Sequence, residues 1–265
     1  MAVPDGLASP APHAGPSGKW LFVIIFSLII LLGIFIAAVL ITSSEDKGVA
    51  VVRMEGVLVT GEFSDPDYAA SEQVGRELRD AADDPMVSAI VLRVDSPGGT
   101  PAAAEEIIQD LEYAKTKKPV VVSMGDMATS AAYYVSAHAD RIYANPDTFT
   151  AGIGVIWTFS DISGWMEREG YNVSVVKSGE KKDMGSTSRP LTSDELAYAQ
   201  QIVNASFEDF VADVLSQRHI ARSDIEDGRV IRGADAVKIN IVDEIGNLND
   251  AIDGASGLAG ENNFF

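Results

Sequence analysis

Short apolar runs alternate with amphipathic stretches along the chain from about residue 48. Runs of consecutive β-branched and other apolar residues are typical of buried strands, and they lie at 49–53, 89–94, 120–124 and 172–177. Apolar residues at helical spacing predict helices at 70–82 and 101–114. Strands separated by helices of this length predict an α/β fold with a parallel sheet.

The clearest helix is predicted over 191–218. Thr192 and Glu195 have the spacing of a capping box, and Pro190 precedes them. The chain then shows a turn, a short helix and a short strand before Gly246. No convincing repeat or internal linker interrupts this part, so residues 43–256 are expected to form one domain, with fraying from 257 to 265.

The N-terminal part has a different pattern. Residues 1–19 are rich in Ala, Pro, Gly and Ser and predict a disordered tail. The 22 residues from Trp20 to Ile41 carry no charge, and a helix of that length can span a hydrocarbon core of about 30 Å. The apolar region of a cleaved signal peptide is usually shorter. We therefore expect a retained transmembrane helix over 20–42.

Charge refines this picture. Lys19 and the terminal amine precede the span, which favours a cytoplasmic N-terminus and an extracytoplasmic domain. The net charge of −19 lies in the part after residue 42 and argues against nucleic acid as a partner. A solvated acidic exterior is the simplest explanation, and steering of a cationic substrate is the alternative. The absence of cysteine excludes disulfides and thiolate chemistry.

Two segments have candidate chemistry. The first, DSPGGT at 95–100, follows a predicted buried strand, and its glycines leave backbone N–H groups free to face a ligand. In the second, small residues surround Ser130 just after the strand at 120–124, as a reactive serine would need. Taken alone, each segment also fits a purely structural role, as a plain turn or a small-residue helix.

A nucleophilic serine needs a general base. His13 lies before the span, His138 is about two helical turns from Ser130, and His219 has no evident partner, so a Ser-His-Asp triad is poorly supported. Lysine is the other option, and 177–183 contains three lysines. A lysine acts as a base only when neutral, which burial favours, and by themselves these lysines also fit a solvated loop. The spacing of His, Asp and Glu predicts no metal site, and no cofactor motif is present.

Four ordered blocks of the sequence resemble the signal peptide peptidase A family. They are DSPGG, then GDMATSAAYYVSAHADRIYANPDTFTAGIGV, then SGEKKDMGSTSRPLTSDE, and finally GRVIRGADAVKINIVDEIGNLNDAI. The resemblance covers about 48–254. It implies a Ser/Lys protease with a Clp protease/crotonase-like fold, built on a repeated β-β-α core. It also implies an N-terminal membrane anchor, assembly into a homo-oligomer, and remnant signal peptides or other short hydrophobic peptides as substrates.

The resemblance assigns roles to individual residues. Ser130 matches the nucleophile and Lys182 the general base, while the backbone N–H groups of Gly99 and Ala131 match the oxyanion donors, with Gly98 as the alternative to Gly99. Tyr133 and Tyr134 match a structural aromatic pair. Relatives typically have glycines where this chain has Ala131 and Ala132, whose methyl groups would narrow the substrate channel but leave the N–H groups in place.

Other functions compete with this one. A Clp-like protease with a histidine triad or with a different specificity would share the fold, as would an acyl-CoA enzyme of the crotonase type, which needs neither the dyad nor an anchor. A membrane-tethered scaffold that has lost catalysis is the non-enzymatic alternative. Labelling by a serine-reactive probe distinguishes the scaffold from the protease.

Overall fold

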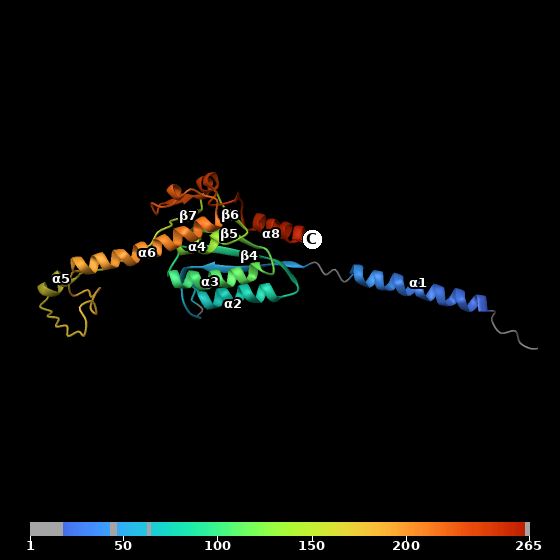
Figure 1. Cartoon of the computed structure of the whole chain (residues 1–265), viewed down its shortest axis with the longest axis horizontal. Coiled ribbons are helices and arrows are strands. Elements are labelled where there is room, and N and C mark those ends of the chain that lie inside the picture. The colour runs from blue at the N-terminus through green and yellow to red at the C-terminus, as the bar shows by residue number, and fades with distance from the viewer. Residues whose placement is uncertain (1–17, 43–46, 63–64, 263–265) are drawn as a thin grey trace, which may run out of the picture. The chain divides into compact units, whose positions relative to one another are not determined.

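The computed structural model describes residues 18–42, 47–62 and 65–262 (Figure 1). Most of the expected disordered tail, residues 1–17, lies outside these ranges. The chain divides into two compact units, one ending at Asp46 and the other beginning at Lys47. Each unit is described by itself.

The first unit contains helix α1 (Gly18–Thr42). It confirms the helix predicted from the uncharged run. From Lys19 to Ile36 its described side chains are all exposed within this unit. By length and composition the helix could cross a membrane. Its insertion in a membrane remains a prediction.

The second unit is built on a sheet of seven described strands. They are β1 (Gly48–Glu55), β4 (Val87–Ser96), β5 (Val120–Thr129), β6 (Arg141–Ala144), β7 (Phe149–Ala151), β8 (Val230–Arg232) and β9 (Glu244–Ile245). The central order is β1-β4-β5-β6-β9, and all of these strands are parallel. Strand β7 pairs in parallel with the carboxyl end of β5 and antiparallel with β8. The predicted α/β fold with a parallel sheet is confirmed.

Helices and short connecting elements make up the rest of this unit. They are α2 (Ser71–Asp83), α3 (Pro101–Lys115), α4 (Ala131–Ala137), α5 (Ser163–Arg168), α6 (Ser193–Gln217), η1 (Arg222–Asp224), α7 (Gly233–Ala236), η2 (Val237–Ile239) and α8 (Leu248–Asn262). A separate two-stranded ribbon joins β2 (Val57–Val59) to β3 (Tyr68–Ala70). The predicted strands at 49–53, 89–94 and 120–124 and the helices at 70–82, 101–114 and 191–218 all have counterparts here.

The side-chain alternation of the strands creates two apolar layers. In β4, Ile90 and Leu92 pack into the larger cluster with α2, α3 and α4, whereas Ala89 and Val91 pack against α8 on the opposite face. Both faces of the central strands are therefore buried, which explains why their sequences are continuously apolar. Helices α2 and α3 lie side by side on the first face (Figure 1).

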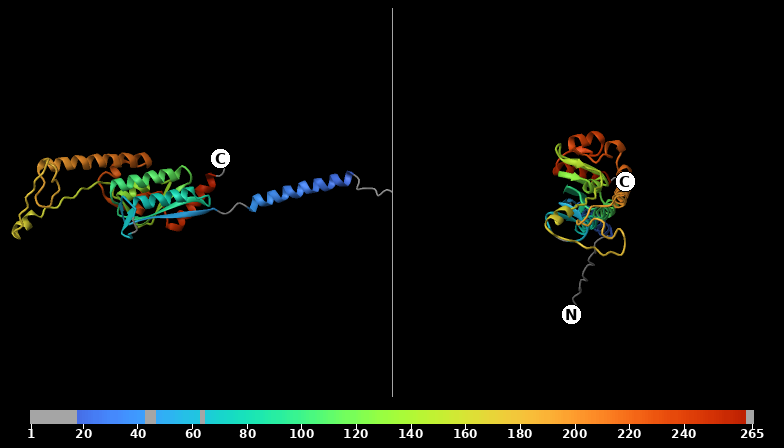
Figure 2. Two further views of the ribbon diagram at one scale, coloured as in Figure 1. Left: turned by 90° about the horizontal axis from the view of Figure 1, so that it is seen from below. Right: turned by 90° about the vertical axis from the view of Figure 1, so that its left-hand side faces the viewer.

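Residues 156–192 leave this layered core. Figures 1 and 2 show α5 and its flanking loops beyond the sheet, at the N-terminal end of α6. The strand predicted at 172–177 is wrong: no strand is assigned there and every residue is exposed. Its apolar pattern suits a strand, but a strand needs a neighbouring backbone for its hydrogen bonds, and this segment has none beside it within the described chain.

The carboxyl end also differs from expectation. Helix α8 continues to Asn262, through most of the region from 257 that the sequence pattern predicted to fray. Ala255 and Ala259 belong to the apolar layer that the helix forms against β4, β5 and β6, and this packing holds its last turns. Residues 263–265 lie outside the described ranges.

Candidate active site

Ser130 lies between the end of β5 and the first residue of α4. Its backbone has φ 55° and ψ −126°, a conformation that residues other than glycine seldom adopt. Hydrogen bonds hold it there: its N–H donates to Ala151 O at 2.8 Å, and its carbonyl accepts from Tyr134 N at 2.9 Å. Such strain costs about 1–3 kcal/mol and persists only where the surroundings enforce it. The half-buried hydroxyl has no hydrogen-bond partner among the described residues.

The glycine turn after β4 packs directly against this serine. At Gly98, φ is +99°, and an added Cβ would lie 2.8 Å from Thr129 O, 2.9 Å from Ala131 N and 2.9 Å from Ser130 Cβ. Thr129 Oγ1 donates to Pro97 O at 3.0 Å and fixes the turn to the end of β5. Only glycine fits this approach, because both the φ angle and the space exclude a side chain.

Hydrogen bonding in the same turn distinguishes the two candidate glycine donors. The N–H of Gly98 donates to Ser96 Oγ at 3.1 Å and is therefore occupied. Leu58 of the short ribbon donates to Gly98 O and accepts from Thr100 N, both at 2.9 Å. In this parallel arrangement the N–H of Gly99, between those two residues, points away from Leu58. Ala131, the first residue of α4, also has an N–H without an intrahelical acceptor.

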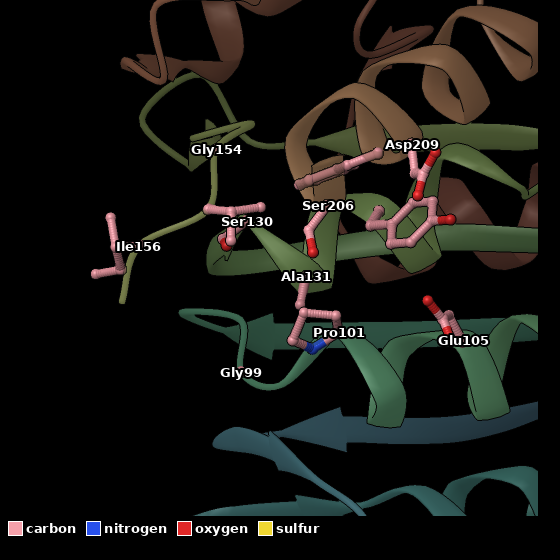
Figure 3. Close-up of a pocket in the computed structure, with 12 residues that line it drawn as sticks. Gly99, Pro101, Glu105, Ser130, Ala131, Gly154, Ile156, Ser206 and Asp209 are labelled. Carbon is pink, nitrogen blue, oxygen red and sulfur yellow. The ribbon is translucent and has the colours of Figure 1, made fainter. Parts of the chain in front are cut away.

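Two cavities flank Ser130. The first, of about 160 Å³, lies between α3, α4 and α6, and its lining includes Gly99, Ser130, Ala131 and Ile156 (Figure 3). The second, of about 610 Å³, lies on the other side of residues 152–156 and reaches Asp227. The serine hydroxyl is thus accessible at the junction of two hollows large enough for parts of a peptide.

No lysine, arginine or histidine lines either cavity. His138 is at the other end of α4, as the sequence spacing indicated, and its ring nitrogens are engaged by Glu112 Oε1 at 2.9 Å and Asp213 Oδ2 at 3.2 Å. Asp213 Oδ2 also accepts from Tyr134 OH at 2.7 Å. This cluster ties α4 to α3 and α6. It engages both ring nitrogens of His138, the histidine that lies closest in sequence to Ser130.

Tyr134 links the cluster to the first cavity. Its side chain lines the cavity, and its ring packs on Phe210 of α6 with centroids 4.6 Å apart. Burial raises the pKa of Tyr134, and so do its bond to Asp213 and the negative charges of Asp213, Glu105 and Asp209. Tyr133 points elsewhere: it is fully buried, and its hydroxyl donates to Ile241 O at 3.1 Å.

Lys182 is not beside Ser130 in this chain. It lies in a turn of the 156–192 segment, where its N–H donates to Gly179 O at 3.1 Å and its side chain is exposed. The neighbouring Lys181 places its ammonium 5.5 Å from the ring centre of Tyr198, near the start of α6. Ser206 of the cavity wall is a further eight residues along, which is about 12 Å of helix. The predicted site residues around 98–131 converge, whereas the predicted base does not join them.

Three site features were missed from the sequence. Glu105 and Asp209 converge on the first cavity, and Asp213 holds Tyr134 and His138. Glu105 follows the glycine turn by one helical turn, which offered a weak signal. Asp209 and Asp213 offered none, because they reach the site only through the packing of α6 on α4. Within the described ranges no group of three or more His, Asp or Glu side chains could hold a metal ion.

Comparisons with known proteins agree with this fold. A family model described as "Peptidase family S49" matches residues 112–261. A putative protease of Methanocaldococcus jannaschii is 38% identical over 189 residues, and Protease 4 of Haemophilus influenzae is 35% identical over 217 residues. These matches cover 70% and 80% of this chain, but 61% and 35% of the two relatives.

A third relative is a putative signal peptide peptidase SppA of Enterococcus faecium, 33% identical over 79% of this chain and 63% of its own length. Among solved structures, a membrane-bound stomatin-specific protease shares the fold with a TM-score of 0.53 at 17% identity, over 78% of this chain and 83% of that one. The fold is that of an α/β protein, and its strained Ser130 lies beside two cavities. The chain belongs to peptidase family S49.

Proposed function

We propose that this protein is a membrane-anchored serine endopeptidase. In this proposal Ser130 is the nucleophile, Lys182 is the general base, and the substrates are remnant signal peptides and other short hydrophobic peptides. The observation that carries the proposal is the strained backbone of Ser130, which presents a hydroxyl without a partner at the junction of two cavities. Helix α1 serves as the anchor, with the N-terminus cytoplasmic and the second unit extracytoplasmic.

The reaction begins when the neutral amine of Lys182 takes the Ser130 proton and the hydroxyl oxygen attacks the peptide carbonyl. The N–H groups of Gly99 and Ala131 then donate to the oxyanion, and a donor of this kind is worth about 2.7–4 kcal/mol. Gly99 is preferred to Gly98 because the Gly98 N–H already donates to Ser96. Lys182 returns the proton to the leaving amine, and water releases the acyl group.

Because Lys182 is separated from Ser130 within one chain, we infer that it comes from a second copy. Exposed apolar side chains gather on the 156–192 segment that carries it, among them Ile156 (90% exposed), Tyr171 (62%) and Val176 (100%). Exposed apolar surface of this kind suits an interface. The proposed enzyme is therefore a homo-oligomer in which the segment of one copy delivers the base to the cavity of its neighbour.

The test uses the full chain in detergent, with Ser130→Ala and Lys182→Ala expressed separately and together. Each variant alone is expected to lose labelling by a fluorophosphonate probe and to lose peptide hydrolysis. Co-expressed copies regenerate about a quarter of the parent's sites, because an intact Ser130 meets an intact Lys182 at one interface in four. Lys181→Ala is the matched control and should keep activity.

The alternative outcomes separate the parts of the proposal. Labelling that persists in Ser130→Ala shows a different nucleophile. Full hydrolysis by Lys182→Ala excludes this lysine as the base. If both variants are inactive and co-expression restores nothing, the base acts within its own chain after a movement of the segment. A folded parent that neither labels nor cleaves points to the scaffold alternative.

A further inference from the structure

The first cavity beside Ser130 has an unusual charge. Glu105 of α3 and Asp209 of α6 both line it, and Figure 3 shows them on opposite walls, at the end away from Ser130. Among the described residues, neither carboxylate has a hydrogen bond or an ion pair. No basic side chain lines the cavity to balance them.

The second cavity provides a comparison within the same molecule. Its lining also includes two acids, but Glu226 pairs with Arg222 at 3.0 Å and Asp227 lies 3.5 Å from Arg229. Those two carboxylates are neutralised by neighbouring arginines, whereas the carboxylates of Glu105 and Asp209 have no such partner among the described residues. The negative potential is therefore concentrated on one side of Ser130.

The same two carboxylates also affect Tyr134. Tyr134 lines the cavity, and the negative charges of Glu105 and Asp209 add to the rise of its pKa that burial and the bond to Asp213 cause. The two carboxylates therefore line the same cavity and act on the same tyrosine. An anionic or strongly acidic side chain would be repelled there, and a cation would be attracted.

The shape of the cavity suits a single long side chain. A volume of about 150 Å³ holds a molecule the size of benzene, and this cavity is comparable at about 160 Å³. The rings of Tyr134 and Phe210 can pack against an aliphatic stem while a charged tip reaches the carboxylates. When Ser130 attacks a carbonyl, the nearest substrate side chain is that of the residue which owns the carbonyl.

We propose that Glu105 and Asp209 are specificity-determining residues, and that this cavity receives a lysine or arginine at the residue whose carbonyl is attacked. This inference rests on the proposed function, because it requires Ser130 to be the nucleophile. It adds a cationic residue at the cleavage point to an otherwise hydrophobic peptide.

The test measures kcat/KM for the full chain in detergent on peptide amides that differ only at that residue, with Arg, Lys, Leu or Glu. The basic peptides are expected to be cleaved on the order of 10-fold better than the Leu peptide, since two partly exposed ion pairs are available. The double variant Glu105→Gln/Asp209→Asn should lose this preference, so that its kcat/KM for the basic peptides falls to that for the Leu peptide. Added salt should weaken the preference of the parent in the same direction.

Glu208→Gln is the matched control. It removes the same charge one residue from Asp209, but Glu208 bonds Arg222 at 2.7 Å instead of lining the cavity. This variant should keep the preference for basic residues. If Glu208→Gln loses it as well, the effect comes from overall charge, and the assignment to this cavity is wrong.

Other outcomes overturn the inference and leave the proposed function intact. They are a parent that cleaves the Leu peptide as well as the Arg peptide, or a double variant that retains the preference, with hydrolysis still dependent on Ser130. Equal loss on all peptides together with weaker self-association would assign the acids to a basic side chain of the neighbouring copy. Hydrolysis that survives in Ser130→Ala would remove the proposed function and this inference with it.

Discussion

At the scale of single residues, two backbone conformations define the candidate site. Ser130 and Gly98 both have positive φ, and they contact one another across the ends of β5 and β4. Ser130 adopts a conformation that glycine would tolerate at lower cost, and its hydroxyl has no hydrogen-bond partner among the described residues. The glycine allows the turn with the candidate oxyanion donor to approach. The geometry of each residue therefore depends on the other.

Gly98→Ala should damage both stability and activity. The new Cβ would meet backbone atoms of Thr129 and Ala131 within 3 Å, in addition to the cost of positive φ. Gly170→Ala is the matched control, because its φ is +78° and no atom lies within 4 Å of the added Cβ. We expect Gly98→Ala to lose at least about 2 kcal/mol more unfolding free energy than the control, and to lose fluorophosphonate labelling. Equal denaturant midpoints would show that the turn is free to move.

At the scale of elements, α6 connects the cavity to the segment that carries Lys182. Its N-terminus is fixed by a full capping box between Thr192 and Glu195. Arg189 extends this cap by bonding Glu195 and Asp183, both at 2.7 Å, which ties the preceding loop to the helix. The orientation of the loop is therefore set by the first turn of α6.

This cap predicts a pH dependence. The bonds from Arg189, followed by those from Thr192, lower the pKa of Glu195 from 4.5 to about 2. A carboxylate whose pKa is lowered on folding adds stability above its unfolded pKa and loses that stability as the pH falls. Protection of the first-turn amides of α6 against hydrogen exchange should thus decline from about pH 4.5 towards pH 2.

Two variants isolate this effect. Glu195→Gln should start with lower protection and lose most of the dependence on pH, because the titrating group is gone. Asp194→Asn changes an acid in the same turn that is not among the partners of Arg189, and it should keep the parent's profile. An unchanged pH profile in Glu195→Gln would mean that another carboxylate controls the helix start.

At the scale of the whole molecule, the exposed segment at 156–192 is the feature that one chain leaves unexplained. The sheet and its helices bury their apolar faces, whereas this segment exposes large apolar side chains and an extended stretch without a strand partner. A second copy would supply both the apolar contacts and the missing neighbour. The same contact would bring Lys182 to another Ser130.

Val176→Asp tests that arrangement. Val176 is fully exposed in the single chain, so its replacement should change the unfolding free energy by no more than about 0.5 kcal/mol. We expect it to weaken self-association in light scattering and to reduce peptide hydrolysis in parallel. Met86→Asp, at an exposed apolar position outside the segment, should do neither. A Val176→Asp protein that assembles and cleaves like the parent would exclude this surface as the interface.

The sequence by itself determined the features that depend on neighbouring residues. Uninterrupted β-branched runs predicted β1, β4 and β5 because buried parallel strands need apolar side chains on both faces. The cap at Thr192 and Glu195 was readable because its hydrogen bonds close within four residues. The sequence linked the glycine turn to Ser130 only through the family resemblance, and the structure brings them together at the carboxyl ends of the adjacent parallel strands β4 and β5.

Only the tertiary structure decided the features that depend on distance across the fold. The run at 172–177 has the pattern of a strand, yet whether a strand forms depends on a partner that the pattern does not encode. Lys182 is separated from Ser130 because α6 is long and straight and begins far from the sheet. Glu105 and Asp209 share a cavity because α3 and α6 reach it from opposite walls, and such convergence is fixed by helix packing rather than by local sequence.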